Sequence, residues 1–208
     1  VLLPFQRLQV QLGRQNPNDS GELHNLRQAE WAGGLPMPGG QALFRGFYCS
    51  ELVMKMLPRQ DPHPGLFDAY AQTLPSLGDA DDVTVQAALR AFELVLLREC
   101  GLLPDLGVAT LAVQSVDPNR RYALRPESGV LAAAGLTDAI DGATLLALQS
   151  ALDAGALPAL QAVCRMALTP LKSALRALIH YHAGTAVLHT RSVLQSVQRL
   201  VDPAAAAA

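Results

Sequence analysis

The sequence predicts a mainly helical protein that begins with a pair of β-strands. Apolar and polar residues alternate over residues 8–12, as in a strand with one buried face. From residue 41 apolar residues recur at helical spacing almost to the end of the chain, with one interruption at about 101–129. Of the 208 residues 50% are apolar and 16% are charged, a composition that can bury a core and excludes a disordered chain. We therefore expect a strand region at 1–33 and a helical domain at 34–202.

The strand region is expected to contain two strands, at about 1–13 and 22–31, with the turn-forming residues 15–21 between them. Two strands alone are only marginally stable in water, so this pair must pack on another part of the fold. Glycine and proline are concentrated at 33–40, which marks the boundary with the helical domain.

Three helices are expected in the first half of the helical domain, at about 41–56, from Pro64 onward, and at 83–100. The third is apolar over most of its circumference because Leu94, Val95 and Leu97 lie beside its main stripe. A helix that is apolar all round is buried, so this helix is expected at the centre of the domain.

Glycine and proline at 101–129 predict an inserted β-hairpin, built from strand-like pieces at about 109–115 and 120–125. After the insertion the helical periodicity resumes. Helices are expected at about 130–135, 141–153, 156–168, 170–182 and 191–201, and a disordered tail at 203–208.

The sequence carries no recognisable catalytic or cofactor motif. It has no phosphate-binding loop, no Gly-x-Ser-x-Gly motif and no His-Glu-x-x-His zinc motif. Cys49, Cys100 and Cys164 are isolated from one another, which predicts neither a structural zinc site nor a disulfide framework. His180 and His182 would face different sides of a helix, which disfavours a metal site or a hydrolase built on them. We expect neither an enzyme nor a bound cofactor.

No segment predicts a membrane span. The two longest charge-free runs, 31–44 and 177–190, have 14 residues each, fewer than the ~20 apolar residues that cross a bilayer. The chain starts Val1-Leu2-Leu3-Pro4, with no Met and no basic segment before an apolar core, so a signal peptide is not expected. We expect a cytoplasmic protein, and we interpret its first residues as the interior of a longer domain.

Glu51 lies on the edge of the apolar stripe of the first helix. A carboxylate in that position needs a partner if it is buried. Lys55, four residues further on, and Arg90 on the central helix are the two candidates. A structural ion pair is the favoured interpretation, and a binding role is the alternative.

Positive charge is concentrated towards the C-terminus. The net charge of the whole chain is −2, but the charge is unevenly distributed along it. Residues 1–153 contain 11 Lys or Arg and 17 Asp or Glu and are therefore acidic. Residues 154–201 contain no acidic residue and five basic ones: Arg165, Lys172, Arg176, Arg191 and Arg199. An acid-free cationic surface attracts polyanions and releases counterions when it binds phosphates. The alternative is a solvated face that only keeps the protein soluble.

The spacing of these residues favours a shared face. One row has helical intervals of four, three, four and four residues: Arg165, Thr169, Lys172, Arg176 and His180. The row lies on one side only if the helix continues past Pro170. A second row consists of Arg191, Gln195 and Arg199.

Short motifs with a family resemblance follow one another over nearly the whole chain. They are Leu3-Pro4-Phe5-Gln6, Gly21-Glu22-Leu23, Leu26-Arg27-Gln28-Ala29-Glu30, Gly46-Phe47-Tyr48-x-x-Glu51-Leu52, Pro64-x-Leu66-Phe67-Asp68-x-Tyr70, Leu89-Arg90-x-Phe92-Glu93-x-x-Leu96-Leu97, Tyr122-x-x-Arg125-Pro126-Glu127-x-Gly129 and Arg165-Met166-Ala167-Leu168. Each is modest alone, but in this order and spacing they resemble the bacterial RecO proteins, the recombination mediators of DNA repair.

The resemblance implies an N-terminal OB-fold barrel followed by a helical domain, with residues 1–33 as a remnant of the barrel that holds its last strands. It implies binding of single- and double-stranded DNA, annealing of complementary strands, and loading of RecA together with RecR and the acidic tail of single-strand-binding protein. It also implies a place at the bacterial nucleoid. The candidates for DNA or acidic-tail contact are then Arg165, Lys172, Arg176, Arg191 and Arg199, with Arg120 and Arg121 at the hairpin turn in second rank.

Two departures from the family pattern matter. Family members carry a further N-terminal stretch with the first barrel strands, so the barrel here would be incomplete, with open edges. Many relatives place a four-cysteine zinc module after the helix matching 83–100, but no cysteine lies between Cys100 and Cys164. The hairpin is therefore expected to hold together without metal.

The alternative function is a helical scaffold that docks RecR or the single-strand-binding protein tail without binding DNA.

Overall fold

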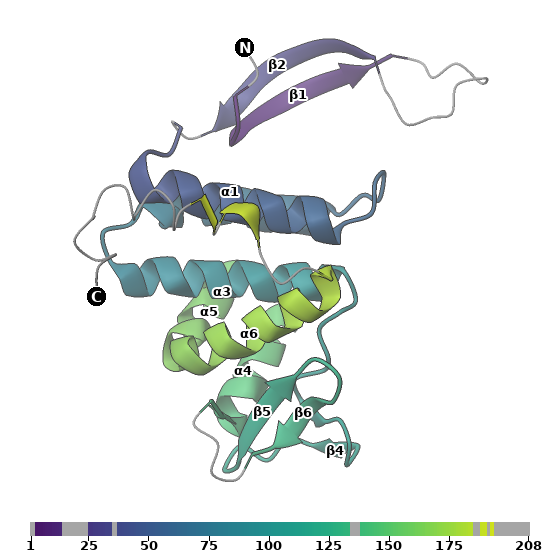
Figure 1. The fold of residues 1–208 in the computed structure, drawn as a ribbon, viewed down its shortest axis with the longest axis vertical. Helices are drawn as coiled ribbons and strands as arrows, with labels where there is room; N and C mark the ends of the chain where they lie inside the picture. The colour runs from purple at the N-terminus through teal and green to yellow at the C-terminus, as the bar shows by residue number, and fades with distance from the viewer. Residues whose placement is uncertain are drawn as a thin grey trace.

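The computed structural model describes residues 3–13, 25–34, 37–133, 138–184, 188–190 and 192–193. This part of the chain is mainly helical, as predicted (Figure 1). The α-helices are α1 (Gly40–Met56), α2 (Pro64–Thr73), α3 (Asp82–Glu99), α4 (Gly142–Asp153), α5 (Leu157–Cys164) and α6 (Leu168–Ala183). Two short 3-10 helices, η1 (Leu74–Gly78) and η2 (Arg165–Ala167), follow α2 and α5.

Helix α3 lies at the centre of the fold, as its apolar sequence predicts. Its buried residues run from Val85 to Leu97, with Phe92 fully enclosed, and α1, α2, α5 and α6 pack against it (Figure 1). Asp81 starts the helix, because its carboxylate accepts hydrogen bonds of 3.1 Å from the backbone N–H groups of Val83 and Thr84.

Strands β1 (Gln6–Leu12) and β2 (Leu26–Gly34) form an antiparallel pair in which Leu8 lies opposite Trp31. Within the described part of the chain they pair only with each other, so no closed barrel is formed there. The pair lies over α1 (Figure 1), where the ring centroids of Phe5 and Phe47 are 5.2 Å apart. Gly46 permits this approach, because a Cβ atom there would lie 2.8 Å from Cε1 of Phe5.

The insertion between α3 and α4 is a small β-structure whose pairing differs from the prediction. Strands β3 (Val108–Ala109) and β4 (Gln114–Ser115) pair with each other, so the piece predicted at 109–115 is itself a tight hairpin. The pieces at 109–115 and 120–125 do not form the predicted hairpin. A separate sheet has the order β6-β5-β7, from β5 (Arg121–Arg125), β6 (Gly129–Ala132) and β7 (Ile140–Asp141).

The helix predicted at 130–135 is wrong for its described residues, because Val130 to Ala132 belong to β6. A short apolar run does not distinguish a strand from a helix by its periodicity. Here tertiary contacts decide: Leu124 lies opposite Val130 in the β5–β6 ladder, and the backbone N–H of Val130 donates to Oγ1 of Thr110 at 2.9 Å.

The helical path between α5 and α6 breaks earlier than expected. The sequence predicts helices at 156–168 and 170–182, whereas the structure has α5, then η2, then α6 from Leu168. The break falls at Ala167, whose φ of −141° and ψ of 40° are not helical.

The helix predicted at 191–201 lies outside the described residues except for 192–193, and the tail at 203–208 lies wholly outside them. No helix in the described ranges is long and apolar enough to cross a membrane.

Candidate nucleic-acid interface

Helix α6 carries the cationic face that the sequence predicts. Its apolar side is buried in the domain core through Leu171, Leu175 and Leu178. Lys172 and Arg176 are one turn apart and exposed on the outer side. Neither forms an ion pair with any residue that the structure describes, so both side chains are available to a phosphate.

Arg165 does not extend this face along one helix, because the condition for a continuous row, an unbroken helix, is not met. The break at Ala167 separates it from α6. The Arg165 guanidinium turns to the start of α3, where Nη2 donates to Oγ1 of Thr84 at 2.9 Å and Nη1 lies 4.0 Å from Oδ2 of Asp81. Its positive charge is therefore partly balanced within the fold. It remains half-exposed, so it borders the candidate interface.

Arg120 and Arg121 lie at the start of β5, and each has an acidic partner. Nε of Arg120 is 3.7 Å from Oδ2 of Asp117, and Nε of Arg121 is 3.3 Å from Oδ1 of Asp141. Arg121 Nη2 also donates to the carbonyl of Ala139 at 2.6 Å. Exposed pairs of this kind are weak, so both arginines are positioned but still accessible.

Arg191 and Arg199, the second predicted row, lie outside the described residues. The structure therefore brings together Lys172 and Arg176, sets Arg165 beside them on a separate turn, and places Arg120 and Arg121 on the inserted sheet, whose strand β5 packs against α6.

Glu51 anchors the C-terminal segment to α1. Its carboxylate accepts hydrogen bonds from the backbone N–H groups of His189 at 2.7 Å and Thr190 at 2.9 Å, and from Oγ1 of Thr190 at 2.6 Å. Nζ of Lys55 lies 3.1 Å away, so one of the two partners considered from sequence does contact Glu51. Burial raises the pKa of Glu51, but the bonds from Thr190, His189 and Lys55 outweigh it and hold the value at about 2.

Arg90, the other partner considered for Glu51, pairs with Glu93 instead, which corrects that expectation. Nη2 of Arg90 and the hydroxyl of Tyr48 both donate to Oε1 of Glu93, at 2.7 and 2.6 Å. Both charged residues are buried, and Arg90 Nε and Glu93 Oε2 have no hydrogen-bond partner in the described structure. Burial raises the pKa of Glu93, opposed by Arg90, Tyr48 and Lys172. All three residues lie in motifs of the family resemblance, but only the spacing of Arg90 and Glu93 could indicate a contact within the network.

No group of three or more potential metal ligands occurs in the described ranges. Cys49 and Cys164 are free and buried. Burial raises the pKa of Cys164 to about 12, and it raises the pKa of Cys49 as well. A thiol must ionise to act as a nucleophile or a metal ligand, so these two residues contribute to packing.

Comparison with known proteins gives the same assignment as the motifs. The family model described as the C-terminal part of recombination protein O matches residues 40–192, the range from α1 through α6. This match defines residues 40–192 as a domain of the recombination protein O class, and in the structure that range is mainly helical.

Two relatives are similar to this chain over nearly its whole length. DNA repair protein RecO of Polaromonas naphthalenivorans (strain CJ2) is 45% identical over 203 residues, which cover 96% of this chain and 79% of the relative. DNA repair protein RecO of Variovorax paradoxus (strain S110) is 43% identical over 209 residues, with the same coverage of 96% and 79%. The chain belongs to the RecO family, and the family predicted from the motifs is confirmed.

Proposed function

We propose that this protein is a non-enzymatic mediator of DNA repair and recombination that binds single- and double-stranded DNA through the outer face of α6. The observation that carries the proposal is the pair Lys172 and Arg176, exposed one turn apart and without an ion pair to any described residue, although Lys172 also favours the charged form of the buried Glu93. Two exposed cations at this spacing contact neighbouring phosphates and release counterions. Arg165, Arg120 and Arg121 would add weaker phosphate contacts at the border.

Within this proposal the strand region and the helical domain, 1–33 and 34–202, are separate units, and β1 and β2 are strands of an OB-type barrel. One face of the pair is apolar, and it is open: Val10 is 45%, Leu12 53% and Trp31 68% exposed. An uncovered apolar face is costly for an isolated strand pair, and additional strands of a barrel would cover it.

The same proposal includes strand annealing and the loading of RecA onto strands coated with single-strand-binding protein, with RecR and the acidic tail of that protein as partners, at the nucleoid in the cytoplasm. The relatives' shared name supports a repair role. The second candidate is a scaffold that docks RecR or the acidic tail without binding DNA. The cationic face suits an acidic peptide as well as a phosphate chain, so the two functions require a direct test.

The test is a titration of fluorescent single-stranded DNA with the Lys172→Glu/Arg176→Glu variant at several salt concentrations. If α6 binds phosphates, the affinity falls by at least about tenfold, and the slope of log affinity against log salt becomes shallower by about 1.4, the share of two contacts on a single strand. A parallel titration with an acidic peptide distinguishes the scaffold, which would bind the peptide and not the DNA.

A matched control is the Arg59→Glu/Arg98→Glu variant, which changes the net charge by the same amount away from α6, in the turn between α1 and α2 and near the end of α3. DNA binding that falls equally in both variants would indicate a response to total charge and would contradict an interface on α6. Unchanged binding by the α6 variant at low salt would contradict it directly.

A further inference from the structure

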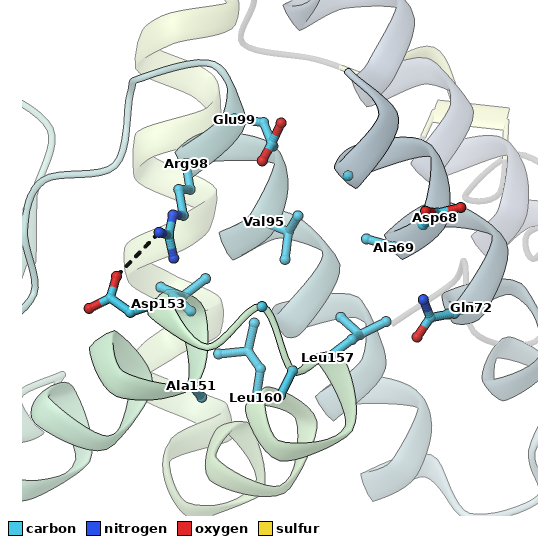
Figure 2. Close-up of a pocket in the computed structure, with 14 residues that line it drawn as sticks. Asp68, Ala69, Gln72, Val95, Arg98, Glu99, Ala151, Asp153, Leu157 and Leu160 are labelled. Atoms are coloured by element: carbon cyan, nitrogen blue, oxygen red, sulfur yellow. Dashed lines mark ion pairs between the residues drawn. The ribbon is translucent and has the colours of Figure 1, made fainter. Parts of the chain in front are cut away.

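A cleft of about 400 Å³ opens between α2, α3 and the turn that joins α4 to α5 (Figure 2). Its floor is apolar and comes from α2, α3 and α5, through Ala69, Val95, Leu157 and Leu160. Leu157 and Leu160 are buried, at 6% and 1% exposure, so the floor is a fixed part of the core. A concave apolar surface of this size accommodates one or two side chains of a partner.

The rim of the cleft is polar and mainly acidic. It consists of Asp68, Gln72, Arg98, Glu99 and Asp153, all of them exposed (Figure 2). Three carboxylates thus surround the opening with a single guanidinium. A rim of this composition attracts cations and repels phosphates and acidic peptides.

The single cation of the rim is already engaged. Nη2 of Arg98 lies 3.2 Å from Oδ1 of Asp153, the ion pair drawn in Figure 2. Oε2 of Glu99 lies 3.2 Å from Nδ1 of His63, and this contact raises the pKa of the imidazole, so His63 partly balances that carboxylate. Oε1 of Glu99 is left towards the cleft near Gly65, 3.5 Å from the position a Cβ atom there would take. Asp68 has no ion pair with any residue of the described ranges.

The dipoles of the neighbouring helices do not change the sign of the electrostatic potential at the rim of the cleft. Helices α3 and α4 end beside the cleft, at Glu99 and Asp153, while α2 and α5 begin beside it, at Pro64 and Leu157. Two negative and two positive ends of helix dipoles largely cancel. The side chains therefore set the charge of the rim, and it is negative.

We propose that this cleft binds a basic segment of a protein partner, one in which Lys or Arg residues flank an aliphatic side chain. The aliphatic side chain lies on Val95, Leu157 and Leu160, and the flanking cations contact Asp68 and Glu99. The Gln72 amide, one turn from Asp68 on α2, can donate to and accept from the backbone of the bound segment. The cleft shares no residue with the face of α6, so the inference does not depend on DNA binding there.

The experiment measures fluorescence anisotropy of a short labelled peptide of alternating lysine and leucine, titrated with the full chain. Two further peptides replace leucine by serine or lysine by glutamate. We expect the Lys-Leu peptide to bind at least about tenfold more tightly than either of them, because only it matches both floor and rim. Equal binding of the Glu-Leu peptide would overturn the assignment of a basic ligand.

Protein variants locate the binding. Asp68→Lys and Gln72→Lys each place a cation on the rim at an exposed position and should weaken the Lys-Leu peptide by about tenfold. The matched control is Glu127→Lys, an exposed acid in the β5–β6 turn. An equal loss in this control would mean that the peptide responds to total charge, and it would overturn the proposal. A self-association that Asp68→Lys abolishes, measured by sedimentation without peptide, would identify a second copy as the occupant and would also overturn it.

Discussion

Glu51 connects two segments that lie far apart in sequence, since its partners His189 and Thr190 are 138 and 139 residues further along the chain. Its ordinary pKa of 4.5 falls to about 2 in the folded protein. A lowered carboxyl pKa stabilises the fold at pH values above 4.5, and this contribution is lost as the pH falls from there towards 2. As the pH is lowered, the segment around His189 and Thr190 should therefore detach from α1 before the core unfolds.

The variant Glu51→Gln tests this. At neutral pH it should lower stability by about 0.5–1.5 kcal/mol, because a neutral amide accepts more weakly from His189 and Thr190 and loses the ion pair with Lys55. Near pH 3 the difference from the unmodified protein should shrink, because there the carboxylate contributes less. Denaturant unfolding and proteolysis of the C-terminal segment at both pH values measure the effect. A loss of the same size at both would contradict the linkage.

Residue-level prediction from sequence reaches as far as local spacing does. Lys55 lies four residues from Glu51 on one helix, and that interval identified it as a candidate partner. The hydrogen bonds from Thr190 depend on how the chain returns to α1, which no local interval encodes. Arg90, the other candidate for Glu51, pairs with Glu93 three residues further along its own helix, a local interval that the sequence contains and that was not weighed.

The joint between α1 and α3 is polar, although both helices are amphipathic towards the core. Tyr48 contributes from α1, and Arg90 and Glu93 contribute from α3. Removing one member of a buried ion pair leaves the other charge without compensation, whereas removing both restores an apolar core. We therefore predict that replacing both Arg90 and Glu93 lowers the free energy of unfolding by less than replacing Glu93 alone.

We expect Glu93→Ala to destabilise the protein by about 3–5 kcal/mol, because the Arg90 guanidinium would stay buried without its carboxylate. The double variant Arg90→Met/Glu93→Leu should recover most of this loss. Urea unfolding of the three proteins measures it. A double variant as unstable as Glu93→Ala would mean that the network has a role beyond charge compensation.

At the element scale, prediction succeeded where the periodicity is long and failed where segments are short. The eighteen residues of α3 carry enough periodic positions to predict a central helix. Gly129–Ala132 is too short, and its pairing with β5 overrides any local preference. The break at Ala167 comes slightly before the boundary predicted at 168–170, because Pro170 is the third residue of α6 and not its first. This break is what removes Arg165 from the predicted row.

At the scale of the whole molecule, two surfaces of opposite charge lie within the described part of the chain. The face of α6 is cationic, and the rim of the α2–α3–α5 cleft is acidic. The net charge of −2 averages these surfaces and conceals both. The cationic face could be predicted because its residues follow one another in sequence. The cleft could not, because its walls come from segments near residues 68, 98 and 155 that only the tertiary fold brings together.

The strand pair and the helical domain should separate cleanly. The family match starts at residue 40, and the contacts of β1–β2 with the helices include the Phe5–Phe47 pair and the Arg7 guanidinium 5.6 Å from the Phe67 ring centroid. Losing aromatic contacts of this kind costs about 1 kcal/mol. For a domain of this size that shifts Tm by about 2–4 °C. A chain that lacks residues 1–36 should therefore still unfold cooperatively, with a Tm only slightly lowered.

The same shortened chain separates the contributions to DNA binding. If α6 supplies phosphate contacts of its own, the fragment retains salt-dependent binding of single-stranded DNA, and Lys172→Glu/Arg176→Glu abolishes what is left. If binding depends on the strand region, the fragment loses affinity while its circular dichroism and unfolding transition stay intact. Non-cooperative unfolding of the fragment would instead show that β1–β2 is part of one folding unit with α1, and it would contradict the division into two domains. Because the outer face of α6 and the strand pair lie on different elements, the two results cannot be mistaken for each other.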